Sequence, residues 1–243
     1  MKGCIIIPVR NEEESISFVV QDLKKLDIFL DYSIIVVDNG STDGTASVVK
    51  DLSVTYLFEK KPGYGNACLR GLEFLKSEPQ KPDWVSFMDG DYSDYATDLL
   101  TLIDYIEKGE ADYICGNRTF FAEDNSLEFI QKFGNTLICK LIQIFYSKKL
   151  NDMGPLKVIL YDKLLDLDMQ DKTWGWNLEM NIKAIQKEMK IIELPVRYRK
   201  RYSGKSKISG NWKMIIPVGL KIISTFIKLL FSKNNFKKKH KDI

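Results

Sequence analysis

The sequence predicts an α/β fold in which helices flank a mostly parallel β-sheet. Through the first half of the 243-residue chain, short apolar runs alternate with segments of helical periodicity, which is the order of crossover units. The runs lack an alternation of apolar and polar residues, so we expect strands that are buried on both faces. The predicted strands cover residues 4–9, 33–38, 54–59, 84–89 and 113–116.

Helices are expected between these strands. Asn11 and Glu14 have the spacing of a capping box and predict a helix that ends near Leu26. Thr42 or Asp43 is expected to cap the next helix, and residues 63–77 and 97–108 have helical periodicity. The second half is more mixed, with an amphipathic stretch over 127–146, an apolar run over 156–161, a helix over 177–187 and a strand pair within 191–198.

Composition excludes several classes of protein. With 44% hydrophobic residues the chain is too apolar to be disordered and long enough for one domain. Its four cysteines form no C-x-x-C pair, which argues against a disulfide framework and a thiolate metal site. The first apolar run is broken by Pro8 and Arg10 and is too short for a secretory signal. We therefore expect a cytoplasmic protein.

Positive charge is concentrated at the C-terminal end. Residues 197–243 hold 14 of the 36 lysines and arginines and one of the 33 acids, so the preceding residues form an acidic body. This split predicts a tail that contacts an anionic surface, either nucleic acid or lipid, although a tail that only aids solubility is an alternative. Because the basic region has few interleaved aromatic residues, nucleic acid is the weaker candidate.

Acidic residues and glycines follow the predicted strands at their carboxyl ends, where α/β proteins bind ligands. Asp89 and Asp91 flank Gly90 directly after the fourth run, and Asp38 follows the second. Paired carboxylates suit Mg²⁺ or Mn²⁺ that carries a diphosphate. The alternatives are a solvated acidic turn for residues 89–91 and a turn or helix cap for Asp38.

The glycine-rich segment 60–67 opens another predicted helix. Its small residues and helix N-terminus suit either a phosphate or close packing against a strand.

Five motifs occur in a fixed order along the chain: Pro-x-x-Asn-Glu at 8–12, Val-Asp-Asn-Gly-Ser-Thr-Asp at 37–43, Gly-x-Gly-x-Ala at 63–67, Met-Asp-Gly-Asp-x-Ser at 88–93 and Gly-Lys-Ser-Lys at 204–207. Together they resemble family 2 glycosyltransferases, most closely the dolichyl- or polyprenyl-phosphate mannose and glucose synthases. The resemblance spans about residues 3–210. It implies a GT-A fold, a nucleoside-diphosphate sugar donor, Mg²⁺ or Mn²⁺, and inversion at the sugar carbon.

The resemblance also implies roles for individual residues. The donor would be bound by Pro8, Glu12, Asp38, Asp89, Gly90, Arg118 and Lys207. The divalent ion would be held by Asp89, Asp91 and Ser93. Catalysis would involve Asp91, Asp152 and Arg201. The charges fit this chemistry, because positioned cations stabilise a leaving diphosphate; for the loop that carries Arg201 and Lys207, plain surface charge is the alternative.

Three departures from the family pattern affect the donor and the acceptor. Asn39 stands where many relatives have a second Asp, which removes a negative charge near the base. Residues 151–157 resemble the acidic turn of the family with a different order of Met, Gly and Pro. Trp174 and Trp176 lie where relatives frame the acceptor, and either core packing or stacking on sugar or lipid suits them.

The residue inventory limits the choice of a catalytic base. The single histidine is His240 in the tail, so a base would be a carboxylate, with Asp152 and Glu179 as candidates and a structural role as the alternative for each. An alcohol acceptor needs such a base, whereas a phosphate monoester is already ionised at neutral pH. A polyprenyl phosphate acceptor is therefore chemically economical.

The segment 212–231 is strongly apolar but carries Lys213, Lys221 and Lys228 at helical spacing. Burying Lys221 at the centre of a bilayer would cost about 2.5–3.5 kcal/mol, so we expect a helix that lies on an anionic membrane surface. Its lysines and the tail lysines 237–239 would face the headgroups. The apolar face would contain Ile215, Ile216, Ile222, Ile223, Phe226 and Leu230. Residues 127–146 are expected to add a second membrane contact or to form a core or dimer helix.

These observations predict a catalytic domain over residues 1–210 and a membrane-associating helix and tail over 211–243. The favoured function is transfer of a hexose from a GDP-mannose or UDP-glucose type donor to a polyprenyl phosphate, peripherally at the cytoplasmic membrane face. One alternative is a glycosyltransferase with an alcohol acceptor on a glycolipid or polysaccharide. The other is a non-catalytic protein that binds nucleotide sugars at the membrane surface.

Overall fold

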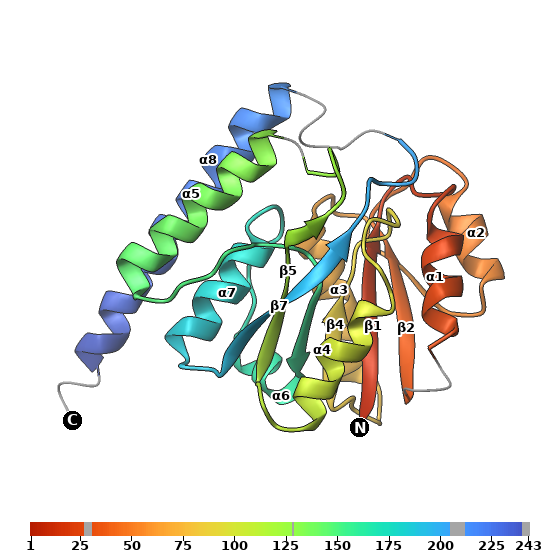
Figure 1. Ribbon diagram of the computed structural model, residues 1–243. Helices are drawn as coiled ribbons and strands as arrows, with labels where there is room; N and C mark the ends of the chain where they lie inside the picture. The colour runs from red at the N-terminus through yellow and green to blue at the C-terminus, as the bar shows by residue number, and fades with distance from the viewer. Residues whose placement is uncertain (27–30, 128, 205–211, 240–243) are drawn as a thin grey trace.

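A mixed β-sheet forms the centre of the molecule in the computed structural model, which describes residues 1–26, 31–127, 129–204 and 212–239 (Figure 1). In these ranges the sheet has seven strands in the order β3-β2-β1-β4-β6-β5-β7. All neighbouring strands are parallel except where β6 pairs with β4 and β5. The predicted α/β class is confirmed. The strands are β1 (Lys2–Val9), β2 (Asp31–Asp38), β3 (Thr55–Phe58), β4 (Trp84–Phe87), β5 (Tyr113–Ala122), β6 (Lys157–Leu160) and β7 (Ile191–Tyr198).

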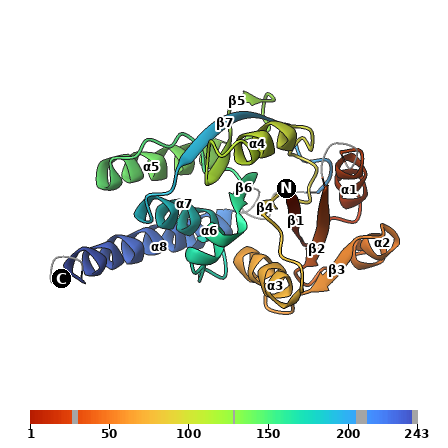
Figure 2. The ribbon, with the colours of Figure 1, turned by 90° about the horizontal axis from the view of Figure 1, so that it is seen from below.

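Helices cover both faces of the sheet, as Figure 2 shows for α1 and α3 on opposite sides. In β1, Ile5 and Ile7 point to one face and Cys4 and Ile6 to the other, because successive strand residues alternate. The first face is covered by α1 (Ile16–Lys24), α2 (Thr45–Asp51) and α4 (Asp98–Glu107). The second is covered by α3 (Tyr64–Ser77), α5 (Phe129–Tyr146), α6 (Tyr161–Asp166), α7 (Trp176–Gln186) and α8 (Trp212–Lys239).

Two predictions about strands are wrong. The third apolar run forms β3 at the edge of the described sheet, where only Leu57 of its four residues is buried, so it is not buried on both faces. Residues 191–198 form the single strand β7, which pairs with the distant β5 rather than with a neighbour in sequence.

The predicted capping box at Asn11 and Glu14 is also wrong. The helix begins at Ile16, and Asn11 instead adopts a left-handed conformation with φ 53°. Its side-chain oxygen accepts a hydrogen bond from the N–H of Thr42 at 2.8 Å, which joins the loops after β1 and β2. The expectation that Thr42 or Asp43 caps the next helix is wrong, because Gly44 holds the N-cap position of α2; Asp43, one residue earlier, accepts from the N–H of Thr45 at 3.0 Å.

Helix α8 docks on the body of the protein through one side. The Nζ of Lys221 lies 2.8 Å from a carboxylate oxygen of Asp171, and the ring of Phe226 packs edge-on against Phe145 of α5 with centroids 5.7 Å apart. The predictions that Lys221 faces the lipid headgroups and that Phe226 faces the membrane are therefore wrong. Across the described residues, none of the helices combines the length and hydropathy needed to cross a bilayer.

The predicted boundary at residue 210 lies outside the described residues and stays a prediction.

Candidate active site

The carboxyl ends of β1, β2 and β4 meet at one edge of the sheet. Val9 and Asp38 end their strands side by side, and the N–H of Asn39 donates to the carbonyl of Val9 at 2.8 Å. On the other side of β1, the N–H of Met88 donates to the carbonyl of Ile6 at 3.2 Å and leads the chain into Asp89. The acidic turn 89–91 thus lies beside the loop that follows β1.

Asp89 and Asp91 place two carboxyl groups close together at this edge. Burial and the nearby charge of Asp91 raise the pKa of Asp89 to about 7, although Arg118 opposes the rise. A third carboxyl, Asp94, is fully buried beside them, and burial followed by repulsion from Asp89 raises its pKa well above the usual range. Its Oδ1 has no hydrogen-bond partner among the described residues. This cluster of hard oxygens has an excess of negative charge that a divalent cation would neutralise.

Local hydrogen bonds fix the orientation of Asp91. Its carboxylate accepts from the hydroxyl of Ser93 and from the N–H of Ser93 at 3.0 Å. Ser93 therefore lies against Asp91, and its role as a metal ligand stays a prediction. In the described ranges no group of three or more His, Cys, Asp and Glu has the arrangement to hold a metal ion, so Asp94 is not counted as a ligand and the candidates are the two carboxylates Asp89 and Asp91 with the hydroxyl of Ser93.

Gly90 lets the acidic turn pack closely on β1. A Cβ atom at this position would lie 2.4 Å from Cγ1 of Val9. The Gly90→Ala variant should therefore lose about 1–3 kcal/mol of unfolding free energy, measured by urea denaturation. In a Val9→Ala background, which removes the clashing methyl group, the same substitution should cost much less. An equal cost in both backgrounds would contradict this packing.

Arg118 and Asp152 form a buried ion pair beside the acidic turn. The Nε and Nη2 atoms of Arg118 donate to the two carboxylate oxygens of Asp152, each at 2.8 Å, and the backbone N–H of Arg118 adds a bond at 2.9 Å. Burial alone would raise the pKa of Asp152, but the hydrogen bonds and charge of Arg118 outweigh it and hold the pKa below its usual range. The geometry therefore gives Asp152 the position of a carboxylate that orients Arg118.

The segment after β7 lies over the acidic turn. Nη2 of Arg201 donates to Glu12 at 2.6 Å and lies 3.8 Å from Asp91. The N–H of Tyr202 donates to the carbonyl of Asp91 at 3.1 Å. Residues far apart in sequence, Glu12, Asp91 and Arg201, are thus brought together as the sequence predicts. Lys207 lies outside the described residues, and its role stays a prediction.

Asp38 is buried at the end of β2, where the register of the sheet pairs it with Val9 of β1, and Pro8 pairs with the preceding Val37. Its carboxylate accepts from the N–H of Ser41 at 2.8 Å and from the hydroxyl of Tyr56 at 3.1 Å. The Tyr56 contact adds a residue that the sequence analysis did not single out. It helps to fix the orientation of the Asp38 carboxylate.

Asn39 joins β2 to the segment before α3. Its amide donates to the carbonyls of Glu59 at 3.1 Å and Lys61 at 2.7 Å, and its oxygen accepts from the N–H of Gly63 at 2.7 Å. A carboxylate could not donate these two bonds, so the departure from the family pattern at Asn39 has a structural reason.

The N-terminus of α3 is used for packing. The N–H of Gly65 donates to the carbonyl of Thr173 at 3.3 Å, and that of Asn66 to Lys172 at 2.9 Å. Of the two alternatives for residues 60–67, the geometry favours packing over phosphate binding.

Of three predicted acceptor-side residues, Glu179 and Trp176 have structural contacts. Glu179 accepts hydrogen bonds from the N–H groups of Gln170 and Asp171, which positions the loop before α7. Trp176 is fully buried and packs edge-on against Phe87. Trp174 is half-buried.

Sequence reasoning also missed Asp94 and Tyr198. Tyr198 stacks under the guanidinium of Arg118, with 4.9 Å between its ring centroid and Cζ. Asp94 follows the recognised motif directly, and a third carboxyl at that spacing was an available signal. The stacking of Tyr198 on Arg118 depends on how the strands pair, so no pattern in the sequence could have indicated it.

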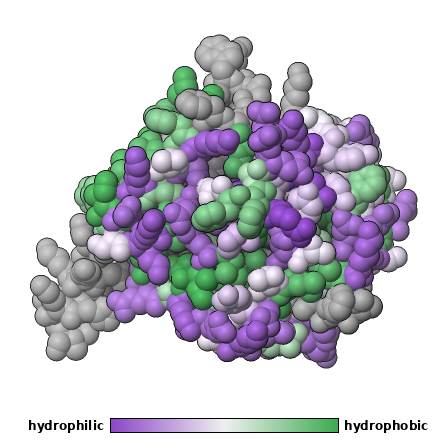
Figure 3. Space-filling model, in the orientation of Figure 1, coloured by the Kyte–Doolittle hydropathy of each residue, from purple (hydrophilic) through white to green (hydrophobic). Residues whose placement is uncertain are grey.

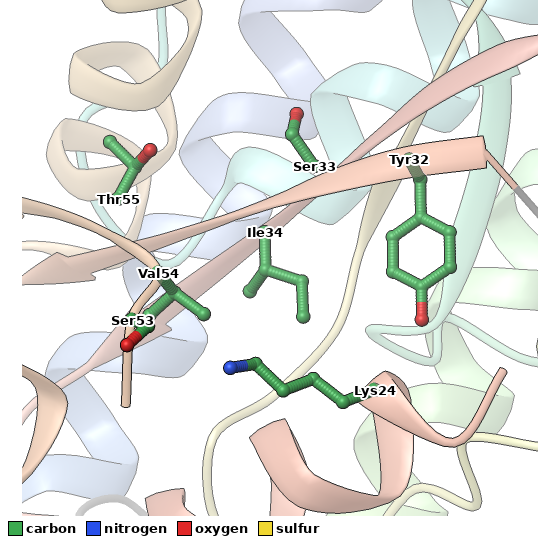
Figure 4. Close-up of a pocket in the computed structure, with 7 residues that line it drawn as sticks. All are labelled: Lys24, Tyr32, Ser33, Ile34, Ser53, Val54 and Thr55. Carbon is green, nitrogen blue, oxygen red and sulfur yellow. The ribbon is translucent and has the colours of Figure 1, made fainter. Parts of the chain in front are cut away.

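A second pocket lies at the opposite end of the strands (Figure 4). Lys24 extends across it toward Ser53 and Val54, which precede β3, and its Nζ donates to the carbonyl of Leu52 at 2.7 Å. The pocket is therefore separate from the acidic turn.

Comparisons with known proteins match this architecture. Residues 4–161 match the family model described as Glycosyl transferase family 2. An uncharacterized glycosyltransferase of Mycobacterium tuberculosis is 31% identical over 207 residues, which are 85% of this chain and 89% of that protein. Glycosyltransferase AglJ of Haloferax volcanii is 25% identical over 202 residues, covering 83% of this chain and 64% of that protein.

Solved structures share the fold at low sequence identity. Glucosyl-3-phosphoglycerate synthase from Mycobacterium tuberculosis, in complex with Mn²⁺, UDP and glucosyl-3-phosphoglycerate, has a TM-score of 0.74 at 16% identity over 94% of this chain and 80% of that chain. The same enzyme with Mn²⁺, UDP-glucose and phosphoglyceric acid has a TM-score of 0.71 at 17% identity over 94% and 79% of the two chains. The predicted GT-A fold is confirmed.

Proposed function

Because the chain belongs to glycosyltransferase family 2, we propose that it transfers a hexose from a nucleoside-diphosphate sugar of the UDP-glucose or GDP-mannose type to a polyprenyl phosphate. The chain is a glycosyltransferase, which argues against the non-catalytic alternative. The observation that carries the acceptor proposal is the Arg118–Asp152 pair. The pair supplies a positioned cation. It also engages both carboxylate oxygens of Asp152, one of the two candidate bases, and lowers the pKa of that carboxyl, which makes it a weaker base.

On the donor side, we propose that Asp38 and Pro8 contact the nucleoside and that Glu12 and Gly90 shape the diphosphate site. Asp89, Asp91 and Ser93 would hold Mg²⁺ or Mn²⁺. These residues fit such an ion, because they offer hard oxygens, and the repulsion between Asp89 and Asp91 is only partly offset by Arg118. The ion would supply positive charge to the diphosphate. The presence of Mn²⁺ with UDP or UDP-glucose in the complexes of the structural neighbours supports this proposal.

In the proposed reaction an acceptor oxygen attacks the anomeric carbon as the bond from that carbon to the diphosphate breaks, with inversion. The electron pair of the breaking bond goes to the diphosphate, where Arg201 and Arg118 stabilise the added charge. Both arginines are held by carboxylates before the donor binds, so little reorganisation is needed. Lys207 would add a further cation.

A phosphate acceptor needs no base in this arrangement. A phosphate monoester has a second pKa near 6 and is already a nucleophile at neutral pH. Glu179, the other candidate base, is engaged by backbone N–H groups of the loop before α7. The site thus suits an acceptor that arrives with its negative charge.

An alcohol acceptor is the second candidate. The observation that favours it is the structural likeness to a synthase whose complexes contain phosphoglyceric acid. Under this alternative Asp152 would act as a base despite its pairing with Arg118.

Transfer from a panel of UDP- and GDP-sugars separates the two candidates. We expect a short-chain polyprenyl phosphate to accept label in the presence of Mn²⁺ or Mg²⁺, and the matching polyprenol without phosphate to accept none. The product should be a glycosyl phosphate, identified by mass spectrometry. Transfer to the polyprenol or to phosphoglycerate alone would contradict the proposal.

We also propose that the enzyme acts peripherally at the cytoplasmic membrane face, where an anionic lipid surface would present the acceptor. The acidic body and basic C-terminal region support this location.

A further inference from the structure

Helix α8 has a second apolar side that no described part of the protein covers. Its docked side places Val218, Phe226 and Leu229 in the interior. Ile216, Leu220, Ile223, Ile227 and Phe231 recur at three- and four-residue spacing on the other side and are 42–63% exposed. The Lys221–Asp171 ion pair fixes which side faces the body, so this outer stripe is a stable feature of the fold.

Helix α5 carries a matching stripe. Ile130, Phe133, Leu137 and Ile144 follow helical spacing and are 40–70% exposed, while Ile138 and Ile142 on the inner side are buried. The two helices touch where Phe226 packs against Phe145 and Tyr146. Figure 1 shows them side by side, and Figure 3 shows hydrophobic side chains gathered over the same region. We call the two stripes the α5–α8 surface.

The positive charge on these helices indicates which partner the α5–α8 surface would bind. Residues 129–149 and 212–239 contain eleven lysines and no aspartate or glutamate. Lys132 and Lys140 on α5 and Lys228 on α8 are exposed. A second copy docking face to face would bring these like charges together, whereas an anionic lipid surface would attract them. Contiguous exposed apolar stripes with cationic flanks are suited to the boundary between headgroups and acyl chains.

We infer that the α5–α8 surface docks on an anionic lipid bilayer, with α5 and α8 lying together in the interface. This inference rests on the proposed function for its biological purpose, since docking would bring the active site to a lipid acceptor. It differs from the sequence-based expectation, which assigned Ile222, Phe226 and Leu230 to the membrane. These side chains pack against the body instead.

Vesicle binding tests the inference without any catalytic readout. The full chain should co-sediment with vesicles of equal parts phosphatidylglycerol and phosphatidylcholine, and much less with phosphatidylcholine alone. A variant with Leu137→Glu and Leu220→Glu should bind about tenfold more weakly or worse. The control with Gln143→Glu and Ser224→Glu adds the same charge at exposed polar positions and should lose about threefold or less.

Equal losses in the two variants would overturn the inference, because charge alone would then explain binding. It would also be overturned if the wild-type chain ignored anionic vesicles, or if it formed a dimer in solution that the Leu137→Glu and Leu220→Glu variant dissociates. Transfer to a short-chain, water-soluble prenyl phosphate should be unchanged in both variants. Vesicle binding without any transfer would refute the proposed function alone, and transfer without vesicle binding would refute this inference alone.

Discussion

The Asp91→Asn variant is expected to lose about a thousandfold or more of its transfer rate while keeping its fold. Asparagine retains an oxygen that can accept from the N–H and hydroxyl of Ser93, so the turn should survive. It lacks the negative charge that would hold a divalent ion and that faces Arg201 at 3.8 Å. Steady-state transfer with saturating Mn²⁺, together with circular dichroism, measures both effects.

The matched control is Asp104→Asn on α4, where an exposed carboxylate pairs with Lys108 and with no other cation among the described residues. This variant should transfer at the wild-type rate. Comparable losses in the two variants, or near-normal transfer by Asp91→Asn, would refute the role assigned to Asp91.

Removing the partner of Arg118 should give the largest loss of stability. In the Asp152→Ala variant the Arg118 guanidinium loses two hydrogen bonds to the carboxylate and the backbone N–H of Arg118 loses a third, so we expect the unfolding free energy to fall by about 3–5 kcal/mol. Asp152→Asn keeps a hydrogen-bonding oxygen and should lose less. Urea denaturation at neutral pH provides the measurement.

The same pair predicts a direction for pH dependence. The pKa of Asp152 is lower in the folded chain than in the unfolded chain, so the pair stabilises the fold above about pH 4. That contribution is lost as the pH falls through the folded pKa. The difference in stability between wild type and Asp152→Ala should therefore shrink in acid. As a control, the exposed Asp104→Ala substitution should change the unfolding free energy by about 0.5 kcal/mol or less. An equally small loss in the Asp152→Ala variant would contradict the burial assigned to the Arg118–Asp152 pair.

The sequence predicted the parts of the site that follow directly from strand order. Apolar runs ending in Asp38 and Asp89 had to finish at one edge once their strands were parallel, and the structure places them there. The apolar run at 156–161 gave no sign of its direction. Only the structure shows that β6 lies antiparallel between β4 and β5.

Other features depended on partners that local pattern cannot identify. Asparagine is common both at helix N-caps and at loop positions with a left-handed conformation. For Asn11, the contact with Thr42 decides between the two. Helical spacing showed which residues of α8 share a side, but Asp171, fifty residues earlier, determines which side faces the body. The same limit applies to Arg118, since its pairing with Asp152 and stacking on Tyr198 join three separate segments.

Calorimetric titration of the protein with UDP and GDP, with and without Mn²⁺, tests the central claim most directly. The account predicts that one of these nucleotides binds at least about tenfold more tightly with Mn²⁺, and that Asp91→Asn removes the difference. Equal affinity with and without the ion, or an unchanged Mn²⁺ effect in Asp91→Asn, would contradict a metal-assisted nucleotide-sugar site at the end of β4.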